Sequence, residues 1–154
     1  MPSFRSERRV RHRSDQMFDL VADVERYPEF VPLCTRLRVR SRRPDAHGGE
    51  TLIAEMSVGY KMIRETFTSR VVLDKPRLRV VVEYIDGPFS HMENIWTFRD
   101  LPEPERSLVT FFIDYEFRSR TLGALMGSMF DAAFRKFSGA FEARADQLGR
   151  PAGA

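Results

Sequence analysis

Apolar residues recur every three or four positions between residues 122 and 148, near the C-terminus. This period places them on one face of an α-helix, with charged residues on the other face. Ser119 or Thr121 can cap the start of the helix, and Gly149 can end it. At about 1.5 Å per residue the helix spans roughly 40 Å, which is longer than a small core requires. The apolar face consists of Leu122, Leu125, Met126, Met129, Phe130, Ala133, Phe134, Phe137, Phe141, Ala145 and Leu148.

Most of the remaining chain alternates apolar and polar residues, a pattern typical of β-strands with one buried face. A strand is predicted at residues 3–12, and Ser14 is predicted to cap a short helix after it. Pro28 and Pro32 restrict the following segment to a second short helical turn or a loop. Six further strands are predicted at residues 34–43, 50–59, 62–73, 78–84, 92–99 and 109–117, separated by short turns.

Strands joined by short turns form an antiparallel sheet, and the apolar face of that sheet has to be covered. The C-terminal helix is the segment long enough to cover it. The predicted fold class is therefore α+β: a seven-stranded, curled antiparallel sheet around a long C-terminal helix, with two short helices after the first strand. We expect one domain over residues 1–149 and a disordered tail over residues 150–154.

The composition is that of an ordinary globular protein, because 42% of the 154 residues are hydrophobic and 31% are charged. No run of about eighteen apolar residues and no secretory signal are visible, so a cytoplasmic location is expected. The single cysteine, Cys34, excludes an internal disulfide and is expected to pack as a small apolar residue. The histidines lack the spacing of metal ligands, so no metal site is expected.

No catalytic motif is visible, and no catalytic residue is predicted. Glu55 and Glu65 lie on adjacent predicted strands and could act together as an acid and a base, although solvent-facing positions explain both more simply. An enzyme is therefore not expected. A cyclase-like or hydrolase-like enzyme that uses carboxylates in a cavity remains a third hypothesis. It predicts a buried Asp or Glu with a strongly raised pKa.

Large apolar side chains are abundant, with 13 Phe, 7 Met, 4 Tyr and one Trp. Many of them fall on the inward faces of the strands or on the apolar face of the helix. A well-filled core explains any one of them. Together they favour a tunnel for a long apolar ligand, since methionine adapts to irregular shapes and one helix over a wide sheet leaves much apolar lining.

The net charge is +3, and arginines cluster at residues 5–13 and 36–43. Two interpretations stay open. The arginines can form the solvated faces of strands. Alternatively, Arg36, Arg38, Arg40 and Arg42 form a basic surface that attracts phosphate, on RNA or on an anionic lipid surface.

Several strings resemble the START-like, helix-grip superfamily, in the same order along nearly the whole chain. They are MFDLVADVERYPEFVPLC at residues 17–34, FTSRV at 67–71, DGPF at 86–89 followed by Trp96 and Phe98, and DYEF at 114–117 before the long helix. Within that superfamily the chain is most similar to the coenzyme-Q-binding family. That family also includes bacterial proteins described as ribosome-association toxins and is often labelled polyketide cyclase or dehydrase.

The resemblance implies a hydrophobic cavity that binds a polyprenyl quinone such as ubiquinone, in a carrier or chaperone that supports respiratory electron transport and has no other cofactor. The alternative is a ribosome-associating protein that blocks subunit association through its basic surface. Tyr27, Phe30, Leu33 and Phe89 are candidates for a gate or a membrane-touching loop. A bacterial protein in the cytoplasm, or at the inner face of the cytoplasmic membrane, is expected. The predicted ligand-binding residues are Met56, Met62, Phe67, Trp96, Phe111, Ile113, Met126, Met129, Phe130 and Phe134.

Overall fold

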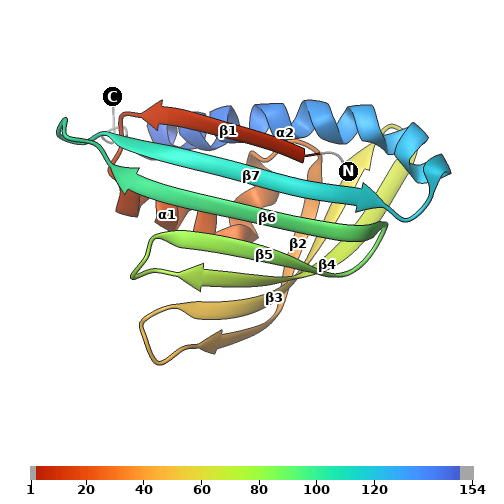
Figure 1. Cartoon of the computed structure of the whole chain (residues 1–154), viewed down its shortest axis with the longest axis horizontal. Coiled ribbons are helices and arrows are strands. Elements are labelled where there is room, and N and C mark those ends of the chain that lie inside the picture. The colour runs from red at the N-terminus through yellow and green to blue at the C-terminus, as the bar shows by residue number, and fades with distance from the viewer. Residues whose placement is uncertain (1–2, 150–154) are drawn as a thin grey trace.

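The computed structural model describes residues 3–149, so the tail predicted at residues 150–154 lies outside the described residues. Within residues 3–149, seven strands and three helical segments follow the predicted order (Figure 1). The elements are β1 (Ser3–Val10), α1 (Ser14–Ala22), the 3-10 helix η1 (Val24–Glu29), β2 (Cys34–Pro44), β3 (Glu50–Tyr60), β4 (Ile63–Asp74), β5 (Arg79–Asp86), β6 (Phe89–Asp100), β7 (Ser107–Phe117) and α2 (Arg120–Leu148). The predicted α+β fold is confirmed.

The strands form one antiparallel sheet in the order β1-β7-β6-β5-β4-β3-β2. Successive strands from β2 to β7 are neighbours, and β1 pairs with β7, so β1 and β2 are the two edges. Figure 1 shows the sheet curling from β7 toward β2, with α2 lying along the β1 and β7 side and the two short helices on the same face as α2. This face is the concave face of the sheet.

The alternation of buried and partly exposed residues along β7 explains why the sheet and α2 pack together. Val109, Phe111, Ile113 and Tyr115 all point to the concave face and are buried, while the residues between them are partly exposed. The matching residues of α2 are buried against them, and burial of apolar surface at about 25 cal/mol per Å² holds the helix in place. Leu125 was expected on this apolar face but is 60% exposed.

Both ends of α2 are capped as the sequence suggests. The Ser119 hydroxyl accepts a hydrogen bond from the backbone N–H of Leu122 at 3.1 Å, and Gly149 donates its N–H to the Ala145 carbonyl at 2.9 Å. The cap of α1 differs from the prediction by one residue. Arg13 occupies the cap position, because Ser14 is buried and donates its backbone N–H to the Asp100 carboxylate at 2.9 Å. This bond ties α1 to the end of β6.

Of the four register shifts in the sheet over residues 3–149, two β-bulges change the direction of residues in the predicted sites. One lies between Val39 and Ser41 in β2, and the other lies between Phe89 and His91 in β6. A bulge adds one residue to one strand, so positions beyond it point to the opposite face from the one that simple alternation predicts. Both bulges affect residues of the predicted sites.

Candidate functional site

A cavity lies between the concave face of the sheet and α2, and its volume is about 90 Å³. Its walls come from β2 to β7, from α2, and from the segment that includes η1 and the loop after it. For comparison, an apolar cavity of about 150 Å³ in another protein admits benzene. The space seen here is therefore smaller than that cavity. Six of the predicted ligand-binding residues line it, namely Met56, Phe67, Trp96, Ile113, Phe130 and Phe134.

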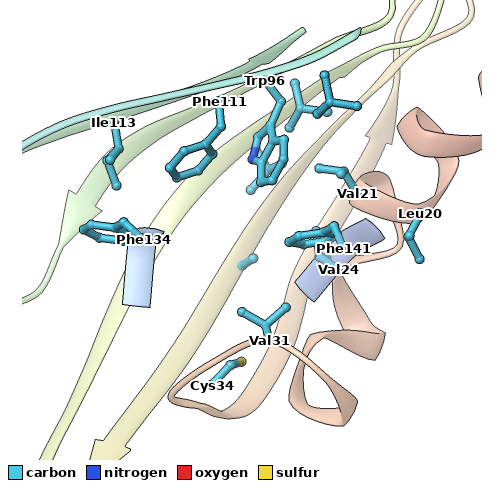
Figure 2. Close-up of a cluster of buried hydrophobic side chains, with 14 of the residues drawn as sticks. Leu20, Val21, Val24, Val31, Cys34, Trp96, Phe111, Ile113, Phe134 and Phe141 are labelled. Atoms are coloured by element: carbon cyan, nitrogen blue, oxygen red, sulfur yellow. The ribbon is translucent and has the colours of Figure 1, made fainter. Parts of the chain in front are cut away.

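Three more predicted residues lie near the cavity without lining it. Phe111 is buried, with its ring centroid 4.7 Å from that of Trp96, and Figure 2 shows both side chains projecting from the sheet. Met126 is 1% exposed, and Met129 is half-buried against the core. These three side chains belong to the hydrophobic core behind the residues that line the cavity.

Met62 is 94% exposed, so its prediction as a cavity residue is wrong. The predicted strand at residues 62–73 began one residue too early. Residues 61 and 62 form the tip of the β3–β4 hairpin, where Lys61 has a φ of +55°. The tip projects away from the sheet and carries Met62 into solvent.

The predicted gate residues divide between two places. Tyr27 and Leu33 line the cavity, and Phe30 packs beside them with its ring centroid 5.0 Å from that of Phe141 on α2. Phe89 is 3% exposed and also lines the cavity, so it is not a membrane-touching tip. The bulge after Phe89 explains this position, since it turns the side chain inward toward Phe67.

The titratable groups beside the cavity are neutral at physiological pH. The Tyr27 hydroxyl donates a hydrogen bond to the Val21 carbonyl, and burial raises the pKa of this phenol above its usual range. Burial also raises the pKa of the Cys34 thiol to about 11. An apolar guest therefore meets no side-chain charge from these two groups.

Two polar residues on the cavity wall were missed by the sequence predictions. Ser69 is 4% exposed, and its hydroxyl has no hydrogen-bond partner within residues 3–149. Asn94 also lines the cavity, and its side-chain N–H donates to the Phe112 carbonyl at 2.8 Å. The sequence feature that could have identified both residues is a polar residue at a position where the alternating pattern of the strand points inward. Asn94 shares that face with Trp96.

The predicted acid–base pair is not formed. Glu55 lies opposite Thr68 in the β3–β4 ladder, whereas Glu65 lies opposite Val58, which is buried on the concave face. The two carboxylates therefore lie on opposite faces of the sheet. No Asp or Glu is buried within residues 3–149. Within the same residues, the carboxyl pKa values that depart from their usual range are all lowered, by hydrogen bonds at Asp15, Glu29 and Asp45.

The four predicted basic-surface arginines do not share one face. Arg36 and Arg38 lie on the convex face, and Arg40 makes an ion pair with Glu55 there at 3.2 Å. The bulge in β2 turns Arg42 to the concave side, where it pairs with Glu25 of η1 and with Glu50 at 3.1 Å. Arg42 is thus a structural ion-pair residue, and its assignment to a single basic surface with the other three is wrong.

Two other kinds of feature, a metal site and a membrane-spanning helix, are absent from the described residues. No group of three or more His, Cys, Asp and Glu side chains in residues 3–149 is placed to hold a metal ion. Over the same residues, no helix has both the length and the apolar character needed to cross a bilayer.

Comparison with known proteins relates this geometry to named relatives. The chain is 30% identical over 151 residues to the ribosome association toxin RatA of Rickettsia prowazekii, covering 96% of this chain and 99% of that protein. It is 33% identical over 138 residues to the mitochondrial coenzyme Q-binding protein COQ10 homolog B of Xenopus laevis, covering 87% of this chain and 54% of that protein.

Solved structures show the same fold. A START superfamily protein from Mycobacterium smegmatis superimposes with a TM-score of 0.78 at 18% identity, covering 95% of this chain and 98% of that chain. The model of the family described as polyketide cyclase / dehydrase and lipid transport matches residues 10–142. The chain therefore belongs to the polyketide cyclase / dehydrase and lipid transport family and has the START-like fold.

Proposed function

We propose that the protein binds a polyprenyl quinone, or an isoprenoid lipid of similar shape, between the sheet and α2, and that it carries this lipid without transforming it. The observation that carries the proposal is the cavity itself, whose lining is almost entirely aromatic and aliphatic. Such a lining stabilises a hydrocarbon tail by removing it from water. The family's description and the coenzyme Q-binding relative support this choice of ligand.

The ligand has to widen the cavity, because about 90 Å³ does not hold a quinone ring. The N-terminal half of α2 has an outer side that faces open space, whereas its inner side is buried at Met126 and Phe130. Leu125 is 60% exposed, and a methyl group built on Gly127 would meet no atom within 4 Å. The C-terminal half is fixed by Phe141, which is 1% exposed.

Trp96 makes the proposal directly testable, since it is the only tryptophan and lines the cavity. A short-chain ubiquinone added to the protein in dilute detergent is expected to quench its fluorescence in a saturable way. Organic extraction of protein purified from native cells is expected to yield a quinone by mass spectrometry. An extract without quinone together with unchanged fluorescence would overturn the proposal.

Two neighbouring alanines on α2 supply matched variants. Ala133 is 4% exposed and lines the cavity, whereas Ala132 faces solvent. Ala133→Leu is expected to fill the cavity and abolish quenching by the quinone. Ala132→Leu adds the same atoms outside the cavity and is expected to bind as the unmodified protein does. Circular dichroism checks that both variants fold.

A second candidate function is ribosome association through the convex face of β2. Within residues 3–149, no carboxylate lies within ion-pair distance of Arg36 or Arg38, so both guanidinium groups are available to phosphate. The relative from Rickettsia prowazekii is named for ribosome association. Basic side chains that bind phosphate give an affinity that falls steeply with salt. This property allows the second candidate to be tested separately from the first.

A further inference from the structure

The cavity holds a buried hydroxyl that the fold does not use. Ser69 is 4% exposed on β4, and its Oγ makes no hydrogen bond within residues 3–149. A buried polar group without a partner destabilises the folded state, so native proteins contain few of them. An alanine at this position would fill almost the same volume without that cost. The hydroxyl therefore calls for a partner that enters the cavity.

Asn94 presents a second polar group on the same face of the sheet. The Phe112 carbonyl can only accept a hydrogen bond, so the amide nitrogen of Asn94 must point toward it, at 2.8 Å. This contact fixes the orientation of the side chain. It leaves Oδ1 and the second amide hydrogen for another partner on the cavity side.

The strand register places these two residues on the same face of the sheet, on β4 and β6, with β5 between them. Asn94 lies opposite Val82, and Val82 lies opposite Val71, which is the next inward residue after Ser69 on β4. Both residues line the cavity, whose other walls are apolar. The polar groups of Ser69 and Asn94 thus occupy one part of an otherwise apolar lining.

We propose that Ser69 and Asn94 form the polar end of the cavity and hydrogen-bond the oxygen-bearing ring of the bound lipid. The inference rests on the proposed function and adds the position of the head group. A quinone has two carbonyl oxygens on opposite sides of its ring, so one can accept from the Ser69 hydroxyl and the other from the free amide hydrogen of Asn94. A quinol hydroxyl can donate to the Asn94 Oδ1. The same pair therefore serves both redox forms of the ring, while the tail extends along the Phe and Met side chains.

The test compares Ser69→Ala with a control that shares its chemistry. Ser107 is the other buried serine whose hydroxyl has no partner within the described residues, and it does not line the cavity. Both Ser69→Ala and Ser107→Ala remove an unpaired hydroxyl, so each is expected to raise the Tm of the unliganded protein by about 2–4 °C. Ser69→Ala alone is expected to weaken binding of a short-chain ubiquinone, by about tenfold, as measured by quenching of Trp96.

A second ligand distinguishes failure of the head-group proposal from failure of the lipid-binding proposal. The isoprenoid hydrocarbon that lacks the ring is expected to bind the unmodified protein and Ser69→Ala with the same affinity, so it should displace the quinone more easily from Ser69→Ala. If Ser69→Ala binds the quinone as tightly as the unmodified protein, the head-group site is wrong and the lipid-binding proposal stands. If the unmodified protein binds neither probe, the lipid-binding proposal fails and the head-group site fails with it.

Discussion

The ring of Phe141 on α2 lies 5.0 Å from the indole of Trp96 on β6, between centroids, with the two planes at 69° (Figure 2). Such edge-to-face contacts contribute beyond the burial of the rings alone. Phe141 also meets Phe30 at 5.0 Å and Tyr27 at 5.3 Å. One side chain thus joins the long helix to the sheet and to the segment around η1.

Phe141→Ala is expected to destabilise the protein by about 3–5 kcal/mol, because it removes a fully buried ring and leaves a cavity. Urea denaturation followed by circular dichroism measures this difference. Leu125→Ala, on the exposed side of the same helix, is expected to change the unfolding free energy by less than about 0.5 kcal/mol. Equal losses in the two variants would show that Phe141 does not anchor α2.

Stability is expected to fall as the pH rises above about 10. Burial raises the pKa of Tyr27 in the folded state, so the unfolded chain loses the phenol proton first and is favoured by rising pH. Tyr27→Phe lowers stability by about 1 kcal/mol near neutral pH, through loss of the hydrogen bond to Val21, and this difference should shrink above pH 10. Unfolding curves at several pH values measure it. If the stabilities of the two proteins changed with pH in parallel, the prediction that burial raises the pKa of Tyr27 would be wrong.

Cys34 is expected to react slowly with thiol reagents in the native protein at pH 8. Its pKa of about 11 leaves little thiolate at that pH, and the side chain is 7% exposed. The rate of reaction with a disulfide reagent should rise by orders of magnitude in denaturant. Equal rates in the native and unfolded states would show that the loop before β2 opens freely.

Two glycines are expected to respond in opposite directions to replacement by alanine. Gly87 has a φ of +143°, and an added Cβ would lie 2.6 Å from the Phe67 side chain, so Gly87→Ala should cost more than about 1 kcal/mol. Gly127 lies in α2 with open space around it, and Gly127→Ala should stabilise the protein by about 0.5–1 kcal/mol. Thermal unfolding shows whether each variant is more or less stable than the unmodified protein. A gain for Gly87→Ala would show that the β5–β6 turn is not constrained.

Ribosome association, if it occurs through β2, is expected to depend on Arg36 and Arg38. The double variant Arg36→Glu, Arg38→Glu should lose co-sedimentation with ribosomes at low salt, because both phosphate contacts become repulsive. Arg77→Glu, Arg79→Glu changes the charge equally on and near the β4–β5 turn and serves as the control. The same loss in both double variants would mean that only net charge matters. Absence of co-sedimentation by the unmodified protein at low salt would remove this function.

The elements were predictable from the sequence because they depend on local periodicity. Alternation identified each strand, and the spacing of three and four identified α2. The direction of individual residues was less predictable, since a bulge leaves no clear mark in the sequence. Arg42 was placed incorrectly for this reason. Phe89 was expected at the tip of a turn over residues 86–89, whereas it is the first residue of β6. Met62 was misplaced by one residue at a hairpin tip, where the alternating pattern continues past the end of the strand.

The site was only partly predictable. The aromatic and methionine side chains indicated an apolar interior between sheet and helix. The size of the cavity could not follow from them, because it depends on how the side chains interlock. Ser69 was missed, since a small polar residue in a strand looks like a solvent-facing position until the register shows which way it points. Asn94 shares a strand face with Trp96 in the sequence pattern, but it was not recognised as a residue of the site.

The position of β2 at the end of the sheet gives its arginines a further effect. The strand is 11 residues long, and within residues 3–149 no other strand pairs with its outer side. An open edge of this kind can recruit the same strand from a second molecule and start aggregation. Here the bulge interrupts the regular ladder, and the positive charges of Arg36 and Arg38 repel an identical edge. We therefore expect Arg36 and Arg38 to help keep the protein dispersed at high concentration, whatever partner they meet.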